Sequence, residues 1–109
     1  MTATFEVVAD DSRRRILDLL VEKERAVGDL VDRLALSQPT VSKHLKVLRD
    51  AGLVEARTDA QRRVYRVRTE PLRELDDWLT PYRRQWAGHL NALERHLEIM
   101  DEAGEESWS

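Results

Sequence analysis

The stretch Ser37–Gly52, with the sequence SQPTVSKHLKVLRDAG, constrains the fold most, because it marks both ends of a single helix. Ser37 is a residue type that caps helix N-termini by accepting a hydrogen bond from a free backbone N–H. Pro39 falls in the first turn, where its missing N–H costs nothing. Gly52 follows the last residue of the pattern and can adopt the left-handed conformation that ends many helices. The stretch therefore predicts one helix between these two residues.

The two faces of this predicted helix differ in chemistry. Val41, Leu45 and Leu48 recur at helical spacing and form one apolar face. The opposite face carries hydrogen-bonding and cationic side chains, namely Gln38, Ser42, Lys43 and Lys46. Such a helix fits the major groove of DNA. An ordinary solvent-exposed amphipathic helix has the same pattern, so this stretch alone leaves both interpretations open.

A shorter helix is predicted directly before it, over Val27–Ala35, with Ala35, Leu36 and Ser37 as the connection. Two helices joined this tightly, the second with a basic outer face, indicate a helix-turn-helix. Upstream, Phe5–Ala9 predicts one or two helical turns. A further helix is expected from Asp10 or Asp11 to about Lys23.

Three arginines, Arg13 to Arg15, crowd the start of that upstream helix, where the helix dipole disfavours cations. Something else must therefore favour them there. DNA phosphate and a partner's carboxylate are two possible explanations, and plain solvation is the third.

A β-hairpin is predicted after Gly52, because Leu53–Thr58 and Arg63–Arg68 are rich in β-branched or aromatic residues and a polar run separates them. The loop between them, residues 59–62, lacks an Asn-Gly or Asp-Gly signature. A basic hairpin directly after a helix-turn-helix indicates the wing of a winged helix. Its tip residues, Arg62 and Arg63, would then reach phosphate or a minor groove. The alternative is that these arginines serve solubility alone.

The rest of the chain, Glu70 to about Ala103, predicts helix with an apolar residue at every third or fourth position. This stripe is longer than a small domain can cover with its own core, so it predicts packing against another subunit. Thr80 and Pro81 predict a kink or a break. Trp78, Tyr82 and Trp86 surround that point and are expected in the interface core. A pocket for a small molecule or lipid is the alternative.

The net charge of −3 hides an uneven distribution. Residues 12–68 carry an excess of six positive charges, and residues 69–109 an excess of six negative ones. This asymmetry favours a nucleic-acid surface in the middle of the chain. The absence of cysteine excludes disulfides and thiolate metal sites. With no apolar run near 20 residues and no signal peptide, the expected location is the cytoplasm. No phosphate loop or catalytic constellation is present, so we expect no enzyme and no cofactor.

The segments VADDSRRRILDLL and VGDLVDRLALSQPTVSKHLKVLRDAGLVEARTDAQRRVYRV resemble the ArsR family of bacterial winged-helix repressors. The resemblance extends from Phe5 to about Met100. It implies a mainly α-helical fold, with a helix-turn-helix, a two-stranded β-wing and long C-terminal dimerisation helices. It also implies a homodimer that binds an imperfect inverted repeat overlapping its own promoter, and in many members an inducer that releases the DNA.

The expected division is a single winged-helix domain over residues 1–103, with a helix-turn-helix (27–52), a wing (53–68), a dimerisation segment (70–103) and a flexible tail (104–109). The predicted DNA-binding residues are Gln38, Pro39, Thr40, Ser42, Lys43, His44, Lys46, Arg57, Arg62 and Arg63. The predicted dimer-interface residues are Phe5, Val8, Leu79, Tyr82, Trp86, Leu90, Leu93 and Leu97. The rival function is a winged-helix protein-interaction module without DNA binding.

The resemblance also bears on metals, because many members of the family sense them. The helix that would carry a cysteine pair has none. His89 and His96 lie on the last helix, but residue 87 is Ala where the pattern requires an Asp two residues before the first His. The sequence therefore predicts a member of the branch that does not sense metals.

Overall fold

The computed structural model describes the backbone of residues 2–103 and the side chains of residues 3–88 and Arg95. The predicted tail, residues 104–109, lies outside the described residues, as do the side chains of Leu90, Leu93 and Leu97. The chain forms two compact units, one ending at Leu75 and the other beginning at Asp76.

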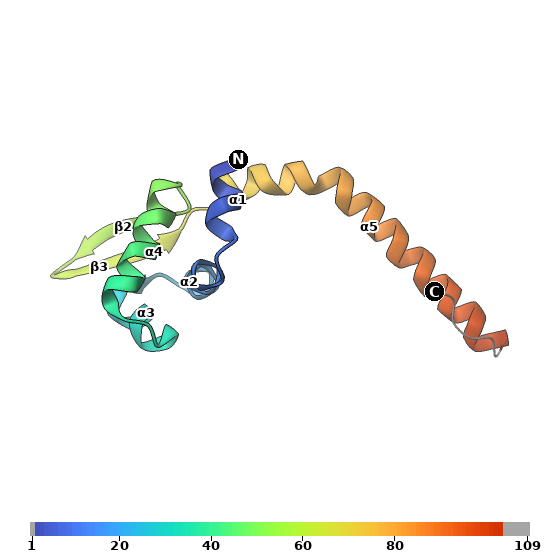
Figure 1. Ribbon diagram of the computed structural model, residues 1–109, viewed down its shortest axis with the longest axis horizontal. Helices are drawn as coiled ribbons and strands as arrows, with labels where there is room; N and C mark the ends of the chain where they lie inside the picture. Colours follow the sequence, from blue (N-terminus) through green and yellow to red (C-terminus); the bar gives the residue numbers. More distant parts are fainter. Residues whose placement is uncertain (1, 104–109) are drawn as a thin grey trace. The chain divides into compact units, whose positions relative to one another are not determined.

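The elements follow the predicted order, mainly helical with a hairpin (Figure 1). They are α1 (Thr2–Val8), α2 (Asp11–Glu22), β1 (Arg25–Ala26), α3 (Val27–Leu34), α4 (Gln38–Asp50), β2 (Val54–Asp59), β3 (Arg62–Val67) and α5 (Glu70–Ala103). The first unit contains every element from α1 to β3 and the first residues of α5, up to Leu75.

Helix α4 has the two caps that its sequence predicts. The Ser37 hydroxyl oxygen accepts the backbone N–H of Thr40 at 3.3 Å. At the other end Gly52 has a φ of 76°, and the N–H of Leu53 donates to the carbonyl of Leu48 at 2.9 Å. A left-handed glycine with this bond is the Schellman arrangement, which satisfies carbonyls that the helix leaves without partners.

The apolar face of α4 forms the centre of the core, as predicted. Val41, Leu45 and Leu48 are each at most 1% exposed. They pack in one cluster with buried residues of every helix from α1 to α3 and of the hairpin. Leu53, which directly follows α4, is also fully buried. Its carbonyl accepts the N–H of Arg68 at 2.7 Å, so the end of α4 is linked to the segment between β3 and α5.

Two of the three arginines at the start of α2, Arg13 and Arg14, make side-chain bonds within the chain. Asp10 caps the helix by accepting the backbone N–H of Arg13 at 3.0 Å, and this bond lowers the pKa of Asp10. Arg14 donates from one nitrogen to the carbonyls of Val8 and Ala9, at 3.0 and 3.2 Å, just where α1 ends. Carbonyls at a helix C-terminus carry partial negative charge. They therefore account for this cation without DNA or a partner subunit.

A third strand, β1, was not predicted. The sheet order is β1-β3-β2, and β1 pairs antiparallel with β3 through Arg25 opposite Tyr65 and Ala26 opposite Val64. A strand of two residues has no periodicity for sequence analysis to detect. The hairpin forms where it was predicted, but Asp59 pairs with Arg62, so the expected four-residue loop is a two-residue turn.

Arg25 on β1 holds the surrounding elements together. Its side chain is 4% exposed, and its guanidinium donates to the carbonyl of Leu19 at 2.9 Å, to Asp29 at 2.8 Å and to Glu22 at 2.6 Å. These contacts connect α2, β1 and α3. The hydrogen bond from Arg25 is the main cause of a lowered pKa at Asp29, and the same bond raises the pKa of Arg25.

Helix α5 continues through Pro81, which excludes the break and leaves the kink as the prediction for this point. Proline removes one helical hydrogen bond, and side chains reinforce the helix around it. Thr80 does not cap a new helix, since its hydroxyl donates to the carbonyl of Asp76 at 3.2 Å. Arg83 pairs with the carboxylate of Asp76 at 3.0 Å. A long helix with these contacts on both sides of Pro81 tolerates the loss of one backbone hydrogen bond.

The conformation of Ala35 gives a stability prediction. Ala35 ends α3 in the left-handed region, with φ 55° and ψ 37°, which is strained for any residue with a Cβ. Ala35→Gly is therefore expected to raise the free energy of unfolding by about 1 kcal/mol. Ala51, which ends α4 with φ −85°, is the matched control, and Ala51→Gly should lower it. Urea titrations at one protein concentration would contradict the prediction if both variants lost stability equally.

Candidate nucleic-acid interface

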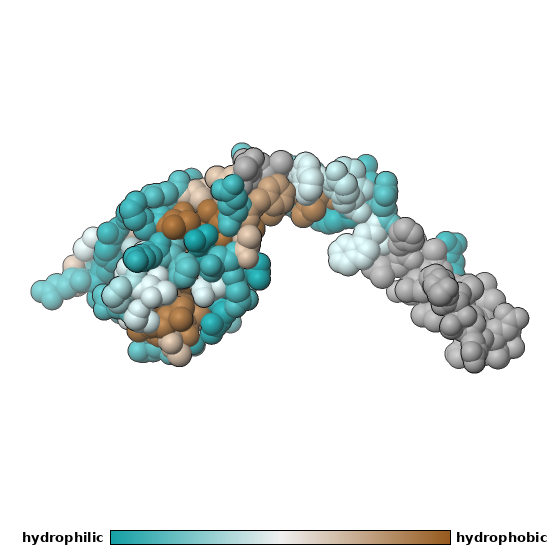
Figure 2. Space-filling view, viewed as in Figure 1, coloured by the Kyte–Doolittle hydropathy of each residue, from teal (hydrophilic) through white to brown (hydrophobic). Residues whose placement is uncertain are grey.

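A groove of about 430 Å³ lies between α4 and the hairpin. Helix α4 contributes residues at i, i+4, i+8 and i+11, so they follow one face. The lining residues are Val27, Gln38, Ser42, Lys46, Arg49, Gln61, Arg63 and Tyr65. The structure thus brings together four of the predicted DNA-binding residues, three from α4 and Arg63 from the hairpin. The hairpin tip, at the left of the view, is hydrophilic (Figure 2).

The pleat of the hairpin decides which arginine faces the groove. Successive residues of a strand point to opposite faces, so Arg63 shares its face with Tyr65, and Arg62 points away. The guanidinium of Arg63 lies 5.7 Å from the centre of the Tyr65 ring. This is the distance of a cation–π contact, which holds the cation at the groove wall.

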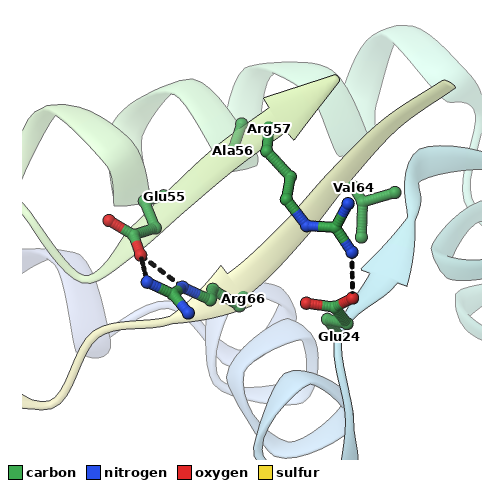
Figure 3. Close-up of a pocket in the computed structure, with 6 residues that line it drawn as sticks. All are labelled: Glu24, Glu55, Ala56, Arg57, Val64 and Arg66. Atoms are coloured by element: carbon green, nitrogen blue, oxygen red, sulfur yellow. Dashed lines mark hydrogen bonds and ion pairs between the residues drawn. The ribbon is translucent and has the colours of Figure 1, made fainter. Parts of the chain in front are cut away.

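Arg57 also lies on the face away from the groove. It is opposite Val64 in the register, and its guanidinium pairs with Glu24 (Figure 3). Arg62 pairs with Asp59 at 3.7 Å within the hairpin. The structure therefore separates these two predicted DNA-binding residues from Arg63.

The groove differs from its surroundings in charge. Its lining contains no carboxylate, whereas three other hollows of the first unit each include at least one, from Glu24, Glu55, Glu70 or Asp18. Lys46 pairs with Asp50 of its own helix at 2.9 Å, a bond that lowers the pKa of Asp50. Within the described part of the chain, the other two cations of the lining, Arg49 and Arg63, make no ion pair. The positive charge of the groove is therefore largely uncompensated.

The remaining predicted residues of α4 lie outside the groove lining. Lys43 and Pro39 are exposed. Thr40 is half-buried and its hydroxyl shares a hydrogen bond with that of Ser37 at 2.8 Å. His44 is half-buried and its Nδ1 accepts from Arg13 at 3.3 Å.

Sequence analysis missed Arg49 and Gln61. Arg49 follows Lys46 at i+3, so helical spacing alone could have placed it on the same face. Gln61 is at the two-residue turn, and its position depends on the exact length of that turn. Two more lining residues were not among the predicted ones, namely Val27, which begins α3, and Tyr65 of β3.

Metal binding and membrane insertion find no support in the described part of the chain. No group of three or more His, Asp or Glu side chains there could hold a metal ion. The side chains of His89 and His96 lie outside the described residues. No helix among the described residues is both long and apolar enough to cross a bilayer.

Two short helices followed by a hairpin, with the second helix and the hairpin facing one groove, define a winged helix-turn-helix protein. Residues 10–56 match the family described as "Bacterial regulatory protein, arsR family". The chain belongs to this family, as its sequence predicted, and its relatives are named as transcriptional regulators.

Two relatives and one solved structure illustrate the similarity. The HTH-type transcriptional regulator Rv2034 of Mycobacterium tuberculosis is 36% identical over 103 residues, which cover 94% of this chain and 91% of the relative. The transcriptional repressor SdpR of Bacillus subtilis is 30% identical over 79 residues, covering 72% and 88%. The homodimeric winged helix-turn-helix DNA-binding domain of Mb0332 from Mycobacterium bovis superposes with a TM-score of 0.63 at 31% identity, covering 81% and 82%.

Proposed function

We propose that this protein is a homodimeric repressor that binds an imperfect inverted repeat in DNA overlapping its own promoter. The observation that carries the proposal is the groove between α4 and the wing (strands β2 and β3), whose lining holds three cations and no carboxylate. A surface of this charge attracts phosphate and disfavours cationic partners. The names of the relatives, which include a repressor and a homodimeric DNA-binding domain, agree with it. A protein with this function would lie in the cytoplasm, bound to the nucleoid. It would catalyse no reaction.

Within the groove, the side chains divide into two roles. Gln38 and Ser42 near the start of α4 have hydrogen-bonding groups suited to base edges, with Thr40 and Lys43 beside them. Cations of the groove, Lys46, Arg49 and Arg63, are suited to phosphates, which fix the register of a protein on the duplex without reading its sequence.

The second copy of the chain would cover the aromatic stripe of α5. Trp78, Tyr82 and Trp86 are 42, 56 and 64% exposed, and Phe5 of α1 is 38% exposed. The rings of Trp78 and Tyr82 are 4.9 Å apart. Large aromatic residues of this exposure are typical of protein interfaces. We therefore assign this stripe to the dimer interface in preference to a pocket for a small-molecule or lipid inducer.

The proposal is tested by selecting operators from a library of random duplexes with the purified protein. We expect enrichment of an inverted repeat, with half-sites roughly 10 base pairs apart or a multiple of this, because two-fold related recognition helices enter successive major grooves. A well-folded protein that enriches no sequence, and that fails to shift any duplex at about 50 mM salt, would overturn it. That outcome would favour the protein-interaction module.

A further inference from the structure

One ion pair joins the wing to the body of the winged helix across the middle strand of the sheet. Glu24 directly precedes β1, and Arg57 lies on β2, the strand at the other edge. Both Ala26 and Arg57 are register partners of Val64 on β3. The side chains of Arg57 and Glu24 therefore meet beside Val64, bridging two strands that do not pair with each other (Figure 3).

The base of the wing is packed into the core through Val54, Val64 and Tyr65, but its polar side chains have few other links to the body. Its remaining ion pairs lie within the hairpin or join it to the segment leading into α5, as with Arg62 to Asp59, Arg66 to Glu55 and Arg68 to Glu55. Among the described residues, Arg57 and Glu24 form the one side-chain ion pair that ties the hairpin to a segment before α4. The backbone ladder between β1 and β3 has two residue pairs. Beyond this buried base, the orientation of the wing thus depends on a small number of polar contacts.

Glu24 is well placed to restrain the wing, because it directly precedes a residue that is itself held in place. The next residue, Arg25, is buried and bonds to Leu19, Glu22 and Asp29 on α2 and α3. A carboxylate next to such an anchor is restrained by its own backbone. It can therefore restrain Arg57, and through it the strand that pairs with Arg63.

We propose that Arg57 is a positioning residue of the DNA site: its ion pair with Glu24 orients the wing so that Arg63 faces α4. This inference rests on the proposed function. It assigns Arg57 a different role from the phosphate contact that its sequence suggests, since Arg57 lies on the face away from the groove and its charge is matched by Glu24.

The test compares Glu24→Gln, Arg57→Gln and the charge-swapped double variant Glu24→Arg with Arg57→Glu. The probe is the operator duplex selected with the wild-type protein, titrated by fluorescence anisotropy at several salt concentrations. Each single variant should bind roughly five- to tenfold more weakly, because both wings of the dimer lose an exposed ion pair. The swapped variant should recover most of the affinity, with the salt slope of the wild type. Thermal unfolding of each variant checks that it is folded.

A direct contact between Arg57 and phosphate predicts the opposite pattern. Glu24→Gln would then strengthen binding by freeing a cation, Arg57→Gln would lower the salt slope, and the swapped variant would remain weak. That pattern overturns the inference and leaves the proposed function intact. If the wild-type protein selects no duplex at all, the proposed function itself has failed, so the two failures are distinguishable.

Discussion

Replacing Arg49 and Arg63 together with alanine is expected to weaken operator binding by roughly 10²- to 10³-fold at physiological salt. Both arginines line the groove and neither makes an ion pair among the described residues. Each cation that neutralises a phosphate releases counterions, and the proposed dimer would lose four such cations. The slope of log affinity against log salt should therefore fall by roughly three to four. Gel-shift or anisotropy titrations at several salt concentrations measure both quantities.

The hairpin offers a matched control for this variant. Arg62 and Arg66 lie on the strand face away from the groove and pair with Asp59 and Glu55. Replacing both with alanine removes the same charge from the chain. If net charge alone governed binding, the two double variants would be equally weak. We expect the control to keep most of its affinity, and equal losses would contradict the assignment of the groove.

Substitution of Arg25 is expected to have the largest effect on stability of the variants considered. Arg25→Met should lower the midpoint of thermal unfolding by roughly 10 °C or more, because it removes three charge-assisted or carbonyl hydrogen bonds from a buried position. The carbonyl of Leu19, which accepts from Arg25 at 2.9 Å, would lose this partner. Calorimetry or circular dichroism at a fixed protein concentration measures the shift.

Two further variants show whether the buried geometry, and not the charge, is responsible. Arg33→Met removes an arginine that also bonds to Asp29, but its side chain is 48% exposed. An exposed pair contributes little, so this midpoint should move by no more than a few degrees. Arg25→Lys keeps the charge but cannot reproduce three directed bonds, so it should not restore the wild-type midpoint. Equal shifts for Arg25→Met and Arg33→Met would show that Arg25 has no special role.

Helix α4 could be predicted closely from the sequence because its signals are local. Ser37, Pro39 and Gly52 each act on the backbone within one helical turn, and all three act in the structure as predicted. The apolar spacing of Val41 and Leu45 needs no knowledge of what they pack against. Local signals of this kind predict the helix in any fold that buries its apolar face.

Predicting which residues line the groove also requires knowing how the strands pair. Strand periodicity alone separates Arg62 from Arg63, and this could have been applied from the sequence. The place of Arg57 follows only from its register opposite Val64 and from Glu24, which is distant in the chain. The burial of Arg25 depends in the same way on tertiary contacts. Composition and spacing treat these residues as ordinary surface cations.

The exposed and the buried face of α4 differ in how far substitutions affect folding stability. Gln38, Ser42 and Arg49 are exposed, while Val41 and Leu48 between them are buried. Under the proposed function, substitutions at the exposed positions alter DNA contacts with little effect on stability, whereas buried ones destabilise the whole domain. If the protein binds DNA as proposed, a gene duplicate would acquire a new operator through a few outward-facing substitutions while its folding stability stays the same.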